Sequence, residues 1–137
     1  MPAVTLYESV SPDVFRHATQ QQHLIASEEE LLARLRIRSR GRHSAFVDLV
    51  ALNGNMLSLG LAGDIACAMF MAESKAPVYL WACREPARGG VQVEFHEEGT
   101  PTLVPAHRVL PLEQVLGIAS LFFRSGSISR EQRWDSD

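Results

Sequence analysis

Histidine is the residue type in this sequence with the widest possible chemistry, because it serves both as a metal ligand and as a general base. The five histidines lie at positions 17, 23, 43, 96 and 107, with no two of them four residues apart and none close to a cysteine. A zinc-binding helix needs that four-residue spacing. The sequence therefore predicts no metal site, and we expect no cofactor.

The tripeptide His96 to Glu98 has the H-x-E order in which a zinc deaminase arranges a ligand and its general base. The second half of that signature, P-C-x-x-C, does not follow, so the chain is not itself such a deaminase. One enzymatic alternative remains: a small site in which Asp64 acts with His96 or His107 in a cleft at a sheet edge. That hypothesis predicts a concave pocket with shifted pKa values for the carboxyl and imidazole groups.

Motifs for nucleophilic catalysis and for phosphate binding are also missing. The sequence has no G-x-S-x-G, and the glycines between Leu59 and Asp64 are accompanied by no Walker lysine. Cys67 and Cys83 lie in apolar stretches, where a thiol is inert, and their spacing fits no disulfide framework. We predict that both are reduced thiols of the core and that the chain is not an enzyme.

Five arginines alternate with other residues from Arg34 to Arg42. Steps of two residues turn a helix by about 200 degrees, so on a helix these side chains spread over opposite faces, and only an extended chain would align them. We interpret the segment as the solvated end of a helix, with Glu30 and Arg34 as a weak pair. A salt-bridge surface for a partner and a small nucleic-acid-binding or regulatory site remain as alternatives.

The acidic residues have a different distribution. The chain has 16 acidic and 13 basic residues and a net charge of -3, and its first 48 residues are balanced, so the whole net charge arises after residue 48. A net negative charge excludes bulk attraction to DNA or to an anionic membrane as the default function. An acidic surface of this kind either is simply solvated or docks onto a basic partner.

Two helices and a run of strands must position these residues. Ser27 followed three residues later by Glu30 is a capping box, which predicts the start of a helix. A second, longer helix is predicted between Pro111 and Gly126, because proline suits the first turn and glycine suits a left-handed C-cap. Its apolar side chains follow the spacing of one helix face.

Elsewhere, short apolar runs separated by turn residues indicate strands. The predicted strands span residues 45–52, 56–61, 65–72, 77–83 and 91–95, with a further short strand at 4–7, and Asn53 to Asn55 is a hairpin signal. We expect an α+β fold in a single domain over residues 1–137. Its antiparallel meander has about five to six strands, with both helices packed on one face.

The longest unbroken apolar run, Ile65 to Ala72, is far shorter than the roughly 20 residues that cross a bilayer. The first ten residues lack the pattern of a secretory signal peptide, and the cysteines fit a reducing compartment. We therefore predict a cytoplasmic protein that does not bind a membrane.

Three blocks of sequence, in this order and spacing, resemble one known family. They are the segment Leu57 to Cys67 with its Gly-Asp pair, the strand Val91 to Phe95, and the block from Leu110 through Gly126 to Trp134. Together with the helix start at residues 27–31, they resemble immunity protein family one of bacterial polymorphic toxin systems over residues 24–135. The segment 127–133 departs from the family pattern, and we interpret Trp134 as a packing residue that holds the C-terminus.

The resemblance implies a domain that binds a cognate toxin as a 1:1 heterodimer in the cytoplasm of the producing cell. The toxin implied is a nucleic-acid cytosine deaminase, whose active site would be covered without covalent change. The resemblance implies no catalytic residue, no direct nucleic-acid contact and no small-molecule substrate. A deaminase has a basic substrate channel, so we expect the acidic half of the chain to meet it. The residues expected to bind the toxin are Asp64, Glu73, Trp81, Glu85, Glu97 and Glu98.

Overall fold

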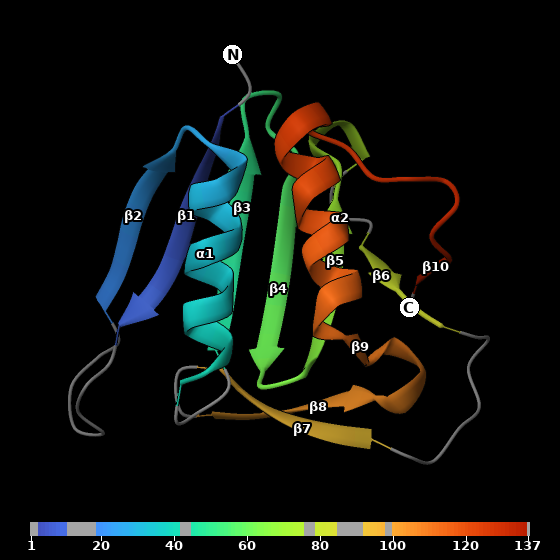
Figure 1. Ribbon diagram of the computed structural model, residues 1–137. Helices are drawn as coiled ribbons and strands as arrows, with labels where there is room; N and C mark the ends of the chain where they lie inside the picture. Colours follow the sequence, from blue (N-terminus) through green and yellow to red (C-terminus); the bar gives the residue numbers. More distant parts are fainter. Residues whose placement is uncertain are drawn as a thin grey trace.

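The fold is described from a computed structural model of the chain, which describes residues 3–10, 19–41, 45–75, 79–84, 92–97 and 100–136. One large antiparallel sheet forms the centre of the molecule. Both α-helices lie side by side on one face of it, and a separate two-stranded hairpin crosses one end of the sheet (Figure 1). The α+β fold class, with both helices on one face, was predicted correctly from the sequence.

The large sheet has eight strands in the order β10-β6-β5-β4-β3-β1-β2, with the short β9 paired to β5. Every pairing in it is antiparallel. The strands are β1 (Val4–Val10), β2 (Thr19–Ile25), β3 (Ala45–Ala51), β4 (Met56–Ala62), β5 (Ile65–Met71), β6 (Leu80–Ala82), β9 (Leu110–Pro111) and β10 (Trp134–Ser136). The separate hairpin consists of β7 (Gln92–Glu97) and β8 (Thr100–Pro105).

The sequence predicted the start of the first helix and the end of the second correctly, whereas Pro111, predicted in the first turn of the second helix, is its N-cap. In α1 (Glu28–Ser39) the Ser27 hydroxyl accepts a hydrogen bond from the Glu30 N–H at 3.1 Å, as in a capping box. The second helix, α2 (Leu112–Ser125), ends at Gly126, whose φ of 69° is the left-handed conformation that favours glycine. Two single turns of 3-10 helix, η1 (Glu73–Lys75) and η2 (Ala106–Arg108), complete the described elements.

The predicted meander is correct for β3 to β6 and wrong at both ends. The strand predicted at 91–95 does not continue the large sheet: as β7 it pairs with β8 in a second sheet. At the opposite edge β1 pairs with β2, a strand that the sequence analysis did not predict. The strand predicted at 77–83 is shorter in the structure: β6 covers only Leu80–Ala82, Tyr79 and Cys83 lie outside the strand, and residues 77 and 78 lie outside the described part.

Alternating residues of each strand divide between two cores. On the helix side, strand residues such as Leu49, Leu59 and Phe70 pack with Leu35 of α1 and Phe122 of α2 in one continuous cluster. On the opposite side, Cys67 packs under the β7–β8 hairpin with the buried residues Phe95, Val104 and Val109. Within the described residues, no helix is long and apolar enough to cross a membrane.

Candidate partner-binding surface

Asp64 and Glu73, the two acidic residues predicted to bind a toxin whose side chains the structure describes, do not lie together. Asp64 lies in the turn before β5 and Glu73 follows that strand, so they stand at its two ends. Seven residues at about 3.3 Å each make the strand between them roughly 20 Å long. Glu85 and Glu98 lie outside the described residues, as does the side chain of Glu97 at the end of β7.

Trp81, the one predicted contact residue that is not acidic, is a partly buried packing residue on the hairpin side of the sheet. The Arg108 guanidinium carbon lies 5.1 Å from the centroid of its ring, a cation–π arrangement. The indole Nε1 is buried, and within the described part of the chain it has no hydrogen-bond partner. Trp81 therefore supports the charged cluster above it more than it offers a free surface.

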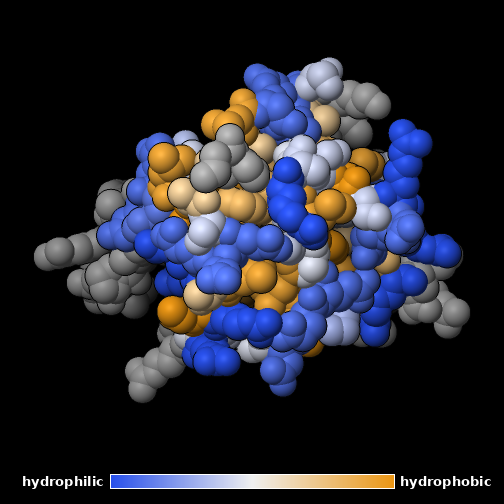
Figure 2. All heavy atoms as spheres, turned by 45° about the horizontal axis from the view of Figure 1, so that its top comes forward, coloured by the Kyte–Doolittle hydropathy of each residue, from blue (hydrophilic) through white to orange (hydrophobic). Residues whose placement is uncertain are grey.

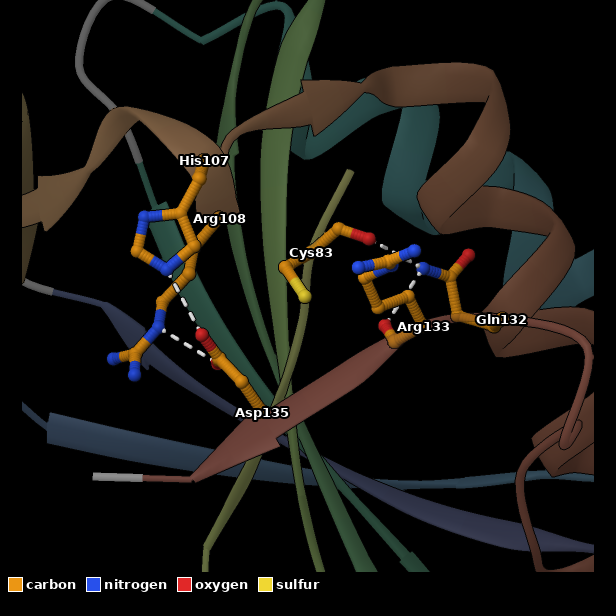
Figure 3. A network of polar contacts seen from close by, with 6 residues as sticks. All are labelled: Cys83, His107, Arg108, Gln132, Arg133 and Asp135. Carbon is orange, nitrogen blue, oxygen red and sulfur yellow. Dashed lines mark hydrogen bonds and ion pairs between the residues drawn. The ribbon is translucent and has the colours of Figure 1, made fainter. Parts of the chain in front are cut away.

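That cluster centres on Asp135 of β10, as Figure 3 shows. One carboxylate oxygen of Asp135 lies 2.9 Å from His107 Nε2, and the other accepts a hydrogen bond from Arg108 Nε at 3.0 Å. His107 and Arg108 are only 9% and 8% exposed. The imidazole considered as a partner of Asp64 is thus bound to a different carboxylate, where it ties η2 to β10.

A second group of contacts in Figure 3 holds the segment before β10 against β6. The Cys83 N–H donates to the Arg133 carbonyl at 3.0 Å, and Gln132 Nε2 donates to the Cys83 carbonyl at 3.1 Å. Trp134 packs its ring edge-on against Phe70, with centroids 6.4 Å apart, and its indole N–H donates to the Ser129 carbonyl. Trp134 is a packing residue, as its position in the sequence indicated.

Both cysteines are free and buried, as predicted. Burial raises the pKa of the Cys67 thiol to about 12. The pKa of the Cys83 thiol is also raised, chiefly by burial and further by the charge of Asp135. Both thiols are therefore protonated at neutral pH, and a protonated thiol is a poor nucleophile and a poor metal ligand. Within the described residues, no three His, Cys, Asp or Glu side chains gather as a metal site.

The arginines of α1 point in different directions, as helical geometry requires. Arg34 pairs with Glu30 of its own helix at 3.4 Å, while Arg38 pairs with Glu8 of β1 at 3.4 Å. Arg36 donates to both carboxylate oxygens of Glu113, at 2.6 and 3.1 Å. This contact lowers the pKa of the Glu113 carboxyl, mainly through the hydrogen bond from Arg36. Arg40 caps the helix and Arg42 lies outside the described residues, so the described arginines form no single basic strip.

A pocket of about 320 Å³ lies between α2 and the C-terminal segment, which we define as residues 127–133. Gln114 of α2 donates to Gln132 of the segment at 2.9 Å, a bond that joins the two walls. The floor includes Gly117, an exposed glycine in the middle of α2. Sequence analysis did not single out this site, although a glycine inside an otherwise helical pattern is a signal that could have marked it.

From the side that brings its top forward, the surface is a mosaic in which small hydrophobic groups lie among hydrophilic ones (Figure 2). Several described ionic groups pair with one another. The features that remain open include Asp64 and Glu73, the exposed arginines of the C-terminal segment and the pocket beside α2, and a partner could contact any of them.

Comparison with known families agrees with that description. The sequence matches the family Immunity protein Imm1 over residues 20–136. No curated protein matches it. The chain therefore belongs to the Imm1 family of immunity proteins, and its role is to bind a toxin and protect against it. The matched range agrees with the span over which the sequence motifs resemble the family.

Proposed function

We propose that this chain binds a cognate nucleic-acid cytosine deaminase toxin as a 1:1 complex and inhibits it by covering the active site without covalent change. The observation that carries the proposal is the family match over nearly the whole chain. The charge distribution of the fold supports the class of toxin. Tight inhibitor complexes form through interfaces of about 800 Å² on each partner, and such an interface requires no chemistry from the inhibitor.

The sheets and η-turns carry most of the unbalanced negative charge. Among the described residues outside the helices and the C-terminal segment, the basic ones are Arg40, Lys75, Arg84 and Arg108, and Arg108 is paired with Asp135. The acidic ones are Glu8, Asp48, Asp64, Glu73, Glu94, Glu97 and Asp135. An enzyme that acts on DNA or RNA has a basic channel for its substrate. A negative surface on the inhibitor complements that channel.

Asp64 and Glu73 lie too far apart to form one compact contact. They are better suited to attracting the toxin as it approaches. Electrostatic attraction extends over a Debye length of about 8 Å at physiological salt, so charges outside the contact still speed association. We therefore assign Asp64, Glu73, Glu85, Glu97 and Glu98 to steering of the toxin, which changes the association rate constant more than the dissociation rate constant. Trp81 would act through the packing beneath this surface.

The arginine segment gives less support to the nucleic-acid alternative. Three of its arginines are paired with carboxylates of α1, α2 and β1. A paired guanidinium gains less binding free energy from a phosphate than an unpaired one. Binding of the purified chain to DNA or RNA that is lost on replacing Arg36, Arg38 and Arg40 by alanine would favour that alternative.

The direct test uses the toxin domain encoded beside the gene for this chain. We expect a 1:1 complex by light scattering, loss of cytosine deamination on DNA or RNA when the chain is added, and unchanged intact masses of both proteins. A toxin that stays fully active in the presence of excess chain, or a toxin of another chemistry, would contradict the proposal.

The assignment to steering is tested with two double variants, each of which removes two negative charges. We compare Asp64→Asn with Glu73→Gln on the sheet side against Glu28→Gln with Glu29→Gln on α1. At low salt the sheet-side variant should lower the association rate constant about twofold to fivefold, and the α1 variant should lower it less. Equal effects from both variants would show that only the net charge matters.

A further inference from the structure

Gly117 lies in the middle of α2, where glycine is a poor choice. It is exposed, and glycine lowers the equilibrium for helix formation about fivefold relative to alanine because it loses more backbone freedom. The residues on either side of it, Leu116 and Ile118, are buried against the sheet and fix the helix there. The choice of glycine therefore calls for a reason.

Nothing within the described fold supplies that reason. A Cβ placed on Gly117 would meet no heavy atom within 4 Å, and its φ is not positive. Other glycines of the chain differ: a Cβ on Gly60 would lie 2.7 Å from the Cys67 sulfur, and Gly126 has a φ of 69°. Alanine at position 117 would fit the isolated protein and stabilise its helix. A contact from outside the described residues, such as one made by a binding partner, would supply the reason.

The surroundings of Gly117 show what could approach it. On the α2 side, the pocket of about 320 Å³ is lined by Gln114, Gly117, Ile118 and Leu121. The facing wall consists of Ser129, Glu131 and Gln132 of the C-terminal segment. The bond between Gln114 and Gln132 and those from Gln132 to the Cys83 and Arg133 carbonyls keep that wall in place.

Glu131 is the only charged residue among those that line the pocket. Its backbone N–H donates to the Ser129 hydroxyl at 3.0 Å, which fixes the backbone at its position. Its carboxylate makes no ion pair within the described part of the chain, unlike those of Glu30, Glu113 and Asp135. The pocket thus combines an apolar floor with one exposed carboxylate that makes no ion pair within the described residues, although Arg130 and Arg133 lie close to it in the sequence.

We propose that this pocket binds a lysine or arginine side chain of the toxin, whose stem lies over the bare backbone of Gly117. The apolar stem would cover Ile118 and Leu121 while the cationic head meets Glu131, the arrangement in which long basic side chains bury their methylenes. The inference rests on the proposed function, because it takes the toxin as the partner. It also names a contact separate from the dispersed carboxylates assigned to steering.

The first test is Gly117→Ala, for which the proposal predicts effects of opposite sign. The added methyl should raise the Tm of the free protein by about 2–5 °C, because it favours the helix. It should also weaken binding of the purified toxin domain about tenfold, mainly through faster dissociation, because the stem can no longer reach the backbone. A Gly117→Ala variant that is more stable and binds as tightly as the wild type would overturn the proposal.

Matched variants test which kind of side chain occupies the pocket, separately from whether the toxin is the partner. Gly117→Leu should abolish most binding, whereas Ala33→Leu, an equally bulky change at an exposed position of α1, should leave it unchanged. Glu131→Gln should weaken binding about tenfold and reduce its salt dependence. Unchanged binding by Glu131→Gln would show that the occupant is not basic and would overturn the assignment. Failure of the wild-type chain to bind the toxin would instead contradict the proposed function.

Discussion

The two faces of the large sheet carry hydrophobic cores of different size. On the helix side, residues from seven strands and both helices form one continuous core, with Phe122 and Leu59 fully buried. On the other face, the β7–β8 hairpin contributes Phe95 and Val104 to a cluster of only four buried residues. Burial of one large apolar side chain contributes about 1.5–3 kcal/mol, so the helix side carries most of the stabilisation and the hairpin is attached more weakly.

The ion pairs on the two faces of the sheet differ in how deeply they are buried. On the helix side, Arg36 and Glu113 are 41% and 70% exposed, and such pairs contribute little. On the far face, the side chains of Arg108 and of its partner Asp135 are 10% and 28% exposed. A charge buried to this extent must keep its partner. The hairpin side therefore depends on this buried pair, whereas the helix side combines its larger packed core with the weak Arg36–Glu113 pair and the partly buried Arg38–Glu8 pair.

The largest effect should follow from truncation of the helix-side core. Phe122→Ala removes a side chain that is 0% exposed and that lies edge-on to Phe70 at 6.3 Å. We expect it to lower the free energy of unfolding by about 3–5 kcal/mol, measured by denaturant titration. Phe122→Leu is the control and should retain most of the stability. A loss below about 1 kcal/mol would contradict the assignment of the main core to this face.

An equally buried phenylalanine under the hairpin should have a smaller and more local effect. Phe95→Ala removes the contact with Phe46, whose ring centroid lies 6.0 Å away. We expect amide hydrogen exchange to accelerate in β7 and β8 while β3, β4 and β5 keep their protection, because the hairpin can open separately from the large sheet. Equal loss of protection in both sheets would show that the two faces unfold as one unit.

The smallest effect concerns the exposed pair of the helices and depends on pH. The pKa of Glu113 is lowered from 4.5 in the folded protein, so the pair stabilises the fold above that pH and is lost as the pH falls through the lowered value. The Tm of the wild type should therefore exceed that of Glu113→Gln at neutral pH, and the difference should shrink as the pH falls below the usual range of a carboxyl group. A difference in Tm that persists at the lower pH would assign the effect to packing.

Helix caps and turns, which depend on interactions between neighbouring residues, were predicted from the sequence. The Ser27 cap, the Gly126 C-cap and the Asn53 to Asn55 turn were all predicted, because each depends on residues a few positions apart. The strand β2 was missed because its run of glutamines gives no apolar alternation. The strand β8 was missed because it contains Pro101 and Pro105, residues that a strand accepts at a sheet edge, and β8 has only one neighbour.

The binding surface could be predicted only in outline. Composition gave an acidic sheet half, but only the topology separates Asp64 from Glu73 along β5. The partner of His107 lies 28 residues further along the chain, at a distance over which spacing carries no information. The pocket beside Gly117 requires α2 and the C-terminal segment to be placed together, so it was not visible in either segment alone.

The alternation of side chains along β10 has a spectroscopic consequence. Trp134 and Trp81 are the two tryptophans of the chain, and the register of β10 with β6 turns them to opposite faces of the sheet. Intrinsic fluorescence of the wild type therefore mixes signals from both faces. A Trp81→Phe variant would fluoresce from the helix-side core, and a Trp134→Phe variant from beneath the cation of Arg108. The chain thus contains an optical reporter for each of its two layers.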